Sequence, residues 1–296
     1  MSGLTQRILT SIVLLPGLLS LMVWGPWQSV AVVGFVVAIV GLWEFTGIVL
    51  PDGSNTIRFI SVGWCILLML GLVTFWSPPV ARPAPFDLSL VPPATPLFVA
   101  LLMGLALTFL IFEGKREDLS PVPSRVGLVF LGIVYLGGLA AHLIFLCRLP
   151  DAMDFKEHFS GWLFLALACT FLADTGGYFF GKFIGGPKLF PSVSPNKTWA
   201  GLFGCIVGAS LGAWGVRFTL MPFLQPVDCL IIGCGAAVLG QTGDFFESLL
   251  KRAYGVKDSG TILPGHGGIL DRVDGLLFNA PLIFYYAIWV VLARPA

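Results

Sequence analysis

Long apolar runs dominate the chain, and short segments between them hold most of the charged and turn-forming residues. An α-helix needs about 20 apolar residues to cross the ~30 Å hydrocarbon core of a bilayer. The pattern predicts an all-α polytopic integral membrane protein with about nine transmembrane helices. The eighth run is short, and we expect its helix to continue past the membrane through Glu247 and Lys251. The predicted spans are Leu4–Val23, Ser29–Leu50, Ile57–Trp76, Pro96–Phe112, Val126–Cys147, Gly161–Phe180, Thr198–Leu220, Val227–Leu239 and Gly275–Ala293.

The segments between the spans divide the chain into two unequal regions. Residues 1–160 are predicted to form about five N-terminal membrane helices with undistinguished loops, and the stretch Ser77–Pro96 holds seven of the 21 prolines. Proline removes backbone donors, so we expect this stretch to be a loop outside the membrane. Residues 161–296 are predicted to form a C-terminal catalytic membrane region, because the polar residues gather in its loops 181–197 and 247–274.

Composition agrees with a membrane protein. Of 296 residues, 56% are hydrophobic and only 11% are charged, whereas a soluble domain has about 25% charged residues. This balance excludes a soluble globule, a disordered chain and a basic nucleic-acid-binding protein. The six cysteines form no C-x-x-C pair, and we interpret them as packing residues.

The placement of the basic residues predicts the orientation of the chain. Lysine and arginine are enriched on the cytoplasmic side of membrane proteins. With nine spans, twelve of the 17 basic residues fall on the side of the N-terminus. The N-terminus and both polar loops are therefore predicted to face the cytoplasm, in a cell (inner) membrane. The five basic residues on the other side are Arg82, Arg148, Lys156, Arg217 and Arg294.

The segment 241–274 combines carboxylates with basic side chains, as a site for a metal-bound polyphosphate requires. Carboxylates hold a hard divalent cation, and lysine and arginine bind phosphate oxygens. The simplest arrangement brings Asp244, Asp271 and Asp274 together around Mg²⁺. The alternative is a set of interfacial ion pairs, Glu247 with Lys251 and the later aspartates with Arg272 or Lys257.

A second polar segment spans residues 173–201. Asp174 lies near the end of the sixth span, where an unpaired carboxylate costs about 2.5–3.5 kcal/mol, so we expect a cation or a polar substrate group beside it. Lys182, Ser194 and Lys197 follow in a Gly/Pro/Ser loop that can wrap phosphates. The alternative is an ordinary positive-inside loop. It is no Walker A loop, because Lys182 is followed by Phe183.

The three histidines differ in their surroundings. His266 lies between two glycines, and we expect it to donate to a phosphate oxygen or to position the turn. His142 lies inside an apolar span and is interpreted as a hydrogen-bonded packing residue. His158 is interpreted as a loop residue.

The segment Ser248–Asp274, with its S-L-L-K-R, K-D and L-P-G-H-G-G-I-L-D-R-V-D elements, resembles the signature of phosphatidate cytidylyltransferases, also called CDP-diacylglycerol synthases. Ala173–Tyr178 and Ser194–Thr198 resemble further stretches of that family. The resemblance implies a polytopic enzyme that condenses CTP with phosphatidic acid to CDP-diacylglycerol and pyrophosphate. It further implies that Mg²⁺ is required, that a second cation can share the site, and that Asp244 and Asp271 are metal ligands.

This chemistry needs positioning and charge neutralisation more than a strong base, because the phosphate of phosphatidic acid already carries the nucleophilic oxygen. In-line attack of that oxygen on the α-phosphorus of CTP then releases pyrophosphate. The expected catalytic residues are Asp244, Asp271, Asp274, Lys257 and His266, of which the three aspartates hold the metal. The expected substrate-binding residues are Asp174, Lys182, Ser194, Lys197, Lys251, Arg252 and Arg272.

Two other functions share parts of this pattern. A CTP-dependent kinase of a lipid alcohol would need a base near its acceptor hydroxyl, and the full signature argues against it. An ion-coupled transporter could use Asp174, but its polar residues should lie near the bilayer centre rather than at one face. We expect the lipid bilayer, CTP and phosphatidic acid as partners and no nucleic acid. A homodimer is compatible with the 36 glycines.

Overall fold

The computed structural model describes residues 16–51, 55–76, 94–114, 117–149, 160–262 and 267–294. Within these ranges the regular secondary structure is helical and includes no β-strand. Residues 16–24 form the first described helix. The π-helices η2 (Val134–Gly138) and η3 (Ala287–Val291) join α5 to α6 and extend α10. The remaining helices are α2 (Trp27–Val49), α3 (Asn55–Phe75), α4 (Ala94–Glu113), α5 (Val122–Ile133), α6 (Leu139–Arg148), α7 (Gly161–Phe183), α8 (Trp199–Thr219), α9 (Pro226–Ala253) and α10 (Leu270–Tyr286).

The predicted all-α membrane architecture is confirmed. Seven helical segments of the described chain are long and apolar enough to cross a membrane, and residues 97–113 form a shorter apolar helix. Most of the first predicted span and of the proline-rich stretch lies outside the described residues. The predicted extension of the eighth span is confirmed, since α9 continues to Ala253. Three other helix ends differ from the predicted spans by three residues or more, because α5 begins at Val122 rather than at Val126, α7 runs on to Phe183, and α10 begins at Leu270 rather than at Gly275.

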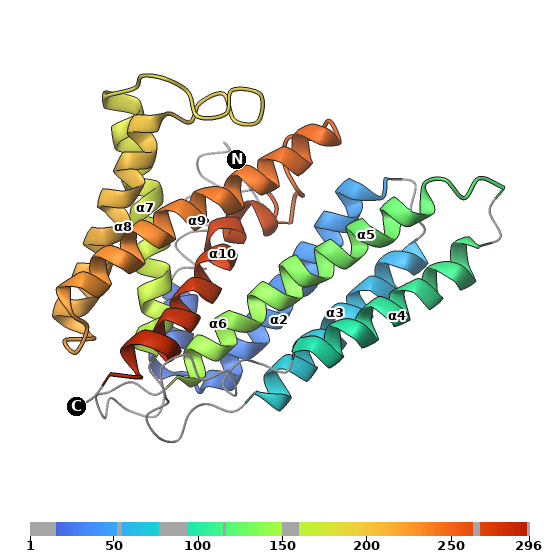
Figure 1. Cartoon of the computed structure of the whole chain (residues 1–296), viewed down its shortest axis with the longest axis horizontal. Helices are drawn as coiled ribbons and strands as arrows, with labels where there is room; N and C mark the ends of the chain where they lie inside the picture. The colour runs from blue at the N-terminus through green and yellow to red at the C-terminus, as the bar shows by residue number, and fades with distance from the viewer. Residues whose placement is uncertain are drawn as a thin grey trace.

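The helices form three neighbouring groups, as Figure 1 shows. Helices α2 to α6 lie side by side, α7 and α8 form a close pair, and α9 and α10 lie between these groups. The connection from α7 to α8 lies at one end of the molecule, and the C-terminus lies at the other. Helix α10 contacts α2, α6, α7 and α9. The central pair therefore joins the N-terminal helices to the α7–α8 pair.

Glycine allows α7 and α8 to pack backbone against backbone. A methyl group on Gly208 would collide with the carbonyl oxygen of Leu172, and one on Gly212 would lie 2.7 Å from the carbonyl oxygen of Ala168. In lipid no hydrophobic effect drives helices together, and association depends on the close packing that small residues allow. The close pairing fixes the end of α7 beside the start of α8, where the polar loop between them begins.

A buried ion pair holds the C-terminal end of the chain. Asp228 in the first turn of α9 is fully buried and accepts hydrogen bonds from both terminal nitrogens of Arg294, at 2.5 and 2.6 Å. The Tyr286 hydroxyl donates to the same carboxylate at 2.6 Å. A buried charge needs such partners to offset its desolvation. The contact joins the start of α9 to the end of the last helix, at the end of the molecule away from the α7–α8 loop.

Two smaller predictions are also confirmed. The His142 ring nitrogens lie 2.9 Å from the Gly138 carbonyl and 3.3 Å from the Tyr285 hydroxyl, as expected of a packing residue. All six cysteines are free, and four are buried as packing residues are, whereas Cys147 is partly buried and Cys234 is exposed. His158 lies outside the described residues.

Candidate active site

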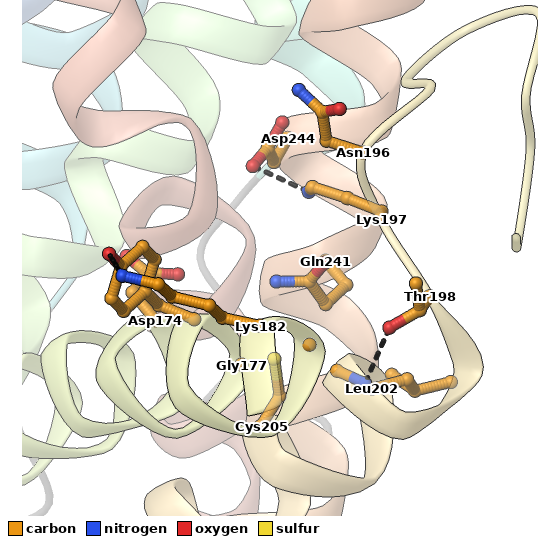
Figure 2. Close-up of a pocket in the computed structure, with 13 residues that line it drawn as sticks. Asp174, Gly177, Lys182, Asn196, Lys197, Thr198, Leu202, Cys205, Gln241 and Asp244 are labelled. Carbon is orange, nitrogen blue, oxygen red and sulfur yellow. Dashed lines mark hydrogen bonds and ion pairs between the residues drawn. The ribbon is translucent and has the colours of Figure 1, made fainter. Parts of the chain in front are cut away.

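A cavity of ≈ 580 Å³ opens between α7, α8, α9 and the loop that joins α7 to α8 (Figure 2). Helix α7 contributes Asp174 and Lys182, and α9 contributes Gln241 and Asp244 from one turn to the next. The loop contributes Asn196 and Lys197. Four of the residues predicted from the two polar segments, Asp174, Lys182, Lys197 and Asp244, therefore line one cavity.

The loop over this cavity is fixed at Lys197. Its ammonium group lies 2.5 Å from the Asp244 carboxylate and 4.5 Å from the centre of the Phe245 ring. The Phe190 ring packs edge-on against the same Phe245 ring. The other Asp244 oxygen accepts a hydrogen bond from Ser248 at 3.3 Å. One ion pair and one aromatic contact thus attach the loop to α9.

Local hydrogen bonds set the course of the loop. Leu189 N–H donates to the Lys197 carbonyl at 3.1 Å, and Lys188 and Thr198 form an antiparallel bridge. Thr198 then caps α8, its hydroxyl accepting from Gly201 N–H at 3.0 Å. Capping side chains of this kind satisfy the free amides of a first helical turn. The backbone of Lys197 is thus fixed by the Leu189 bond and by the bridge and cap of the next residue, Thr198, and its side chain lines the cavity.

Three carboxylates share the surroundings of Lys197. Asp174 and Asp274 both lie close enough to Asp244 to experience its negative charge, and both lie within range of the Lys197 ammonium group. Asp174 is exposed and lines this cavity, so its carboxylate has polar surroundings near the end of the predicted span. Lys182 is also exposed, and it donates to the Tyr178 hydroxyl at 3.0 Å.

A second polar cluster lies between α9 and the start of α10. Lys251 lies 2.9 Å from Glu247 and 2.6 Å from Asp271 Oδ1. Asp271 Oδ2 accepts from Ser259 N–H, the Ser259 hydroxyl and Gly268 N–H, at 3.0, 3.0 and 2.9 Å. The Glu247–Lys251 pair was expected from the sequence. The ammonium group of Lys251 is the cation that contacts Asp271 directly.

The buried Glu44 of α2 also belongs to this second cluster, and the sequence interpretation missed it. Its carboxylate accepts hydrogen bonds from Ile269 N–H, Leu270 N–H and the Ser259 hydroxyl, at 3.1, 3.0 and 3.1 Å. Only 5% of Glu44 is exposed. A lone carboxylate inside a predicted span is itself a signal of function, and that rule would have selected this residue.

Tyr135, on the π-helix η2, is a second residue that the sequence interpretation missed. It is 3% exposed, and its hydroxyl has no hydrogen-bond partner among the described residues. The ring packs edge-on against Phe246 and Phe278 and lies within range of the charges of Asp274, Glu247 and Asp244. Single π-helical turns often mark functional sites, but nothing in its apolar neighbours distinguishes this tyrosine in the sequence.

The charges of the two clusters fit an added cation. Five carboxylates lie in or beside the two clusters, and the ion pairs that they form with lysines of the described chain involve two ammonium groups, those of Lys197 and Lys251. The five are Asp174, Asp244, Glu247, Asp271 and Asp274. Glu247 Oε1 is buried and lacks a hydrogen-bond partner in the described structure. No three His, Cys, Asp or Glu side chains of the described chain converge as a metal site. Oxygen donors and excess negative charge nonetheless suit a hard divalent cation.

The other predicted site residues lie around these clusters. Arg252, Lys257 and Arg272 are exposed, and they lie in or next to the segment that connects α9 to α10. Ser194 lies in the α7–α8 loop, where its N–H bonds to the Phe190 carbonyl, and it does not line the cavity. His266 lies outside the described residues. The structure thus separates the predicted set into a cavity group, the Asp271 cluster and an exposed basic fringe.

Comparison with known proteins agrees with this geometry. The model of the cytidylyltransferase family matches residues 5–290. A phosphatidate cytidylyltransferase of Synechocystis sp. is 29% identical over 310 residues, which cover 96% of each chain. One from Bacillus subtilis is 38% identical over 54% of this chain and 58% of its own, and one from Rickettsia bellii is 32% identical over 64% and 80%. The chain belongs to the cytidylyltransferase family.

Proposed function

We propose that this chain transfers the cytidylyl group of CTP to phosphatidic acid, giving CDP-diacylglycerol and pyrophosphate. The observation that carries the proposal is the family match over residues 5–290. The cavity supports it, because two lysines and two aspartates of the matched segments line one space between helices. Family membership favours this reaction over a lipid-alcohol kinase and over an ion-coupled transporter.

The residues of the cavity provide the means to bring two anions together. The phosphate oxygen of phosphatidic acid attacks the α-phosphorus, a P–O bond forms there, and the bond to the pyrophosphate leaving group breaks. Lys182 and Lys197 line the cavity and would bind phosphate oxygens. Lys251, Arg252, Lys257 and Arg272 would bind the remaining phosphates, with Ser194 and His266 as neutral donors. Such positioning and charge neutralisation supply most of the catalysis.

Asp244, Asp271 and Asp274 are the side chains that we propose to hold Mg²⁺. When bound, the ion would neutralise CTP phosphate charge and polarise the reacting phosphorus. Asp244 would exchange its contact with Lys197, which releases that lysine toward the phosphates. Asp174 and the buried Glu247 oxygen are further oxygen donors that a second cation would use.

The chain is a multi-pass membrane protein by its apolar helices, and we propose that it lies in the cell inner membrane with the site on the cytoplasmic face. The basic residues of both polar segments support this orientation. Cysteines introduced at the exposed Ser192 and Thr261, in a background without the six native cysteines, should react with a membrane-impermeant maleimide only from the cytoplasmic side. If the two cysteines reacted from opposite sides, the two polar segments would lie on opposite faces of the membrane and could not form one site.

The reaction itself can be tested with purified protein in detergent micelles. Phosphatidic acid, Mg²⁺ and CTP labelled at the α-phosphate should give labelled lipid together with released pyrophosphate. CTP labelled at the γ-phosphate, offered with a lipid alcohol, should give no labelled lipid. Transfer of the γ-label would instead establish a kinase. Failure of both reactions with folded protein would overturn the proposed function.

A further inference from the structure

Glu44 connects the N-terminal helices to the Asp271 cluster, although it is 227 positions away from Asp271 in the sequence. We propose that Glu44 is a positioning residue: it holds the start of α10 and Ser259 in place, and through them fixes the Asp271 carboxylate for cation-dependent transfer. The proposal rests on the proposed function in one respect, the role of Asp271. The arrangement itself rests on the contacts of Glu44 alone.

The start of α10 depends on Glu44 for its hydrogen bonds. A helix begins with backbone N–H groups that have no partner within the helix. No side chain of the α10 N-cap residue satisfies them, and Ile269 N–H and Leu270 N–H donate instead to the two Glu44 oxygens. A carboxylate there also interacts favourably with the helix dipole. Helices α7 and α8, in contrast, are capped by their own Ser160 and Thr198.

Ser259 links the two carboxylates. Its hydroxyl lies 3.1 Å from Glu44 Oε2 and 3.0 Å from Asp271 Oδ2. A serine hydroxyl has one proton to donate, so that proton lies between two acceptors. The Ser259 N–H donates to Asp271 as well. A shift of Glu44 would therefore be transmitted to Asp271 both through Ser259 and through the first turn of α10, which contains Asp271.

The glycines around this cluster leave room for the Glu44 side chain. A methyl group on Gly268 would lie 2.5 Å from Glu44 Oε2, and one on Gly260 would collide with Glu44 Oε1. Neither glycine has a positive φ, so backbone strain does not explain them. The last glycine of the G-H-G-G element, Gly268, is instead required because the Ser259 hydroxyl and the carboxylate from α2 occupy the adjacent space.

The position of the cap has a functional consequence. A charged side chain within a membrane span costs about 2.5–3.5 kcal/mol on insertion, and a local Ser, Thr or Asp would cap α10 without that cost. Capping from α2 instead ties the orientation of Asp271 to the N-terminal helices. Residues that orient a metal ligand in this way typically change metal affinity or activity by about 10–100-fold when replaced.

The test replaces Glu44 by Gln, which keeps the size but provides only one acceptor oxygen. The Mg²⁺ concentration for half-maximal transfer should rise about tenfold, while KM for CTP at saturating Mg²⁺ changes little. A second measurement does not depend on activity: the affinity of the purified variant for Mn²⁺, measured by electron paramagnetic resonance, should be weaker than that of the wild type. Amide hydrogen exchange in residues 267–275 should accelerate, with no change in α7 and α8.

Glu113→Gln is the matched control, because Glu113 is also a buried glutamate of the N-terminal helices, 1% exposed and 3.6 Å from Arg125. It should leave the Mg²⁺ and Mn²⁺ dependence unchanged even if it lowers the melting temperature. If Glu44→Gln does not fold, Ser259→Ala tests the same connection, because it removes only the hydroxyl that links Glu44 to Asp271. This variant should also require more Mg²⁺ for transfer and bind Mn²⁺ more weakly, with smaller changes than those expected for Glu44→Gln.

Two results would overturn the proposal: unchanged exchange in residues 267–275, or faster exchange with unchanged Mn²⁺ affinity in Glu44→Gln. Failure of the proposed function gives a different result, since the wild-type protein would then show no cation-dependent transfer. The exchange measurement would still decide whether Glu44 holds the start of α10.

Discussion

Two clusters of carboxylates and lysines lie on neighbouring parts of α9, and they differ in how completely their charges are satisfied. In the cavity cluster, Lys197 and Asp244 form one ion pair with side chains 21% and 37% exposed. In the Asp271 cluster, Lys251 and Asp271 are 12% and 11% exposed, and backbone amides complete the set of donors. The ion pair of the cavity cluster can therefore be exchanged for contacts with a ligand, whereas the Asp271 cluster is held in one arrangement by its hydrogen bonds.

The difference indicates a division of labour. The Lys197–Asp244 pair is more exposed than the Lys251–Asp271 pair, and an ion pair costs less to break as its exposure to water increases. Removing one partner of a buried pair costs about 3–5 kcal/mol. We therefore expect substitutions in the cavity cluster to affect transfer alone, and substitutions in the Asp271 cluster to affect transfer and stability together.

The largest effect is expected from Asp244→Asn. Loss of the charge should reduce cytidylyl transfer by more than about a hundredfold, because a proposed metal ligand is removed from the cavity. The melting temperature should stay close to that of the wild type, since the carboxylate is partly exposed. Transfer per folded protein and thermal melting in the same micelles measure both quantities. Activity above about a tenth of the wild type would exclude Asp244 as a metal ligand.

Asp118→Asn provides the control for this experiment. Asp118 is an exposed carboxylate outside the cavity, hydrogen-bonded to Ser120 N–H at 2.9 Å. Its loss should leave both transfer and melting unchanged. A similar loss of transfer in both variants would point to a general effect of surface charge rather than to the cavity.

Asp271→Asn should combine two losses. Transfer should fall by about a hundredfold, and the melting temperature should also fall, because the amide cannot accept all the bonds now made by Asp271 and leaves Lys251 with one carboxylate fewer.

Asp228→Asn is the matched control for stability. It breaks a buried ion pair with Arg294 at the other end of the molecule and should lower the melting temperature while transfer per folded protein persists. If Asp271→Asn melts at the same temperature as the wild type, the two clusters do not differ in their contribution to stability.

The sequence predicted the helices well because the hydrophobic run is a local property. The spans were recognised from run length alone, and the extension of α9 from its polar end. The sequence also brought Asp174, Lys197 and Asp244 into one hypothesis, and all three line the cavity. It did not reveal that Asp271 is turned toward Lys251, because the position of a side chain around a new helix depends on where that helix begins. Tyr135 was missed because its partners lie on distant helices. Glu44 could have been selected as a carboxylate within a predicted span, but its contacts with the start of α10 could not be predicted.

The smallest of the three effects is expected from Lys197→Gln, which tests whether the cavity cluster exchanges partners. A lost charged hydrogen bond to a substrate phosphate is worth about 1.5–3 kcal/mol, so KM for CTP should rise about tenfold or more. Lys188→Gln is the matched control, since Lys188 belongs to the same loop, its ammonium group contacts the Asn196 carbonyl at 3.4 Å, and it does not line the cavity. Equal changes in both variants would mean that the loop attracts CTP by general charge. A change in Lys197→Gln alone means that the lysine paired with Asp244 in this structure is the one that moves to the nucleotide, as an open cluster requires.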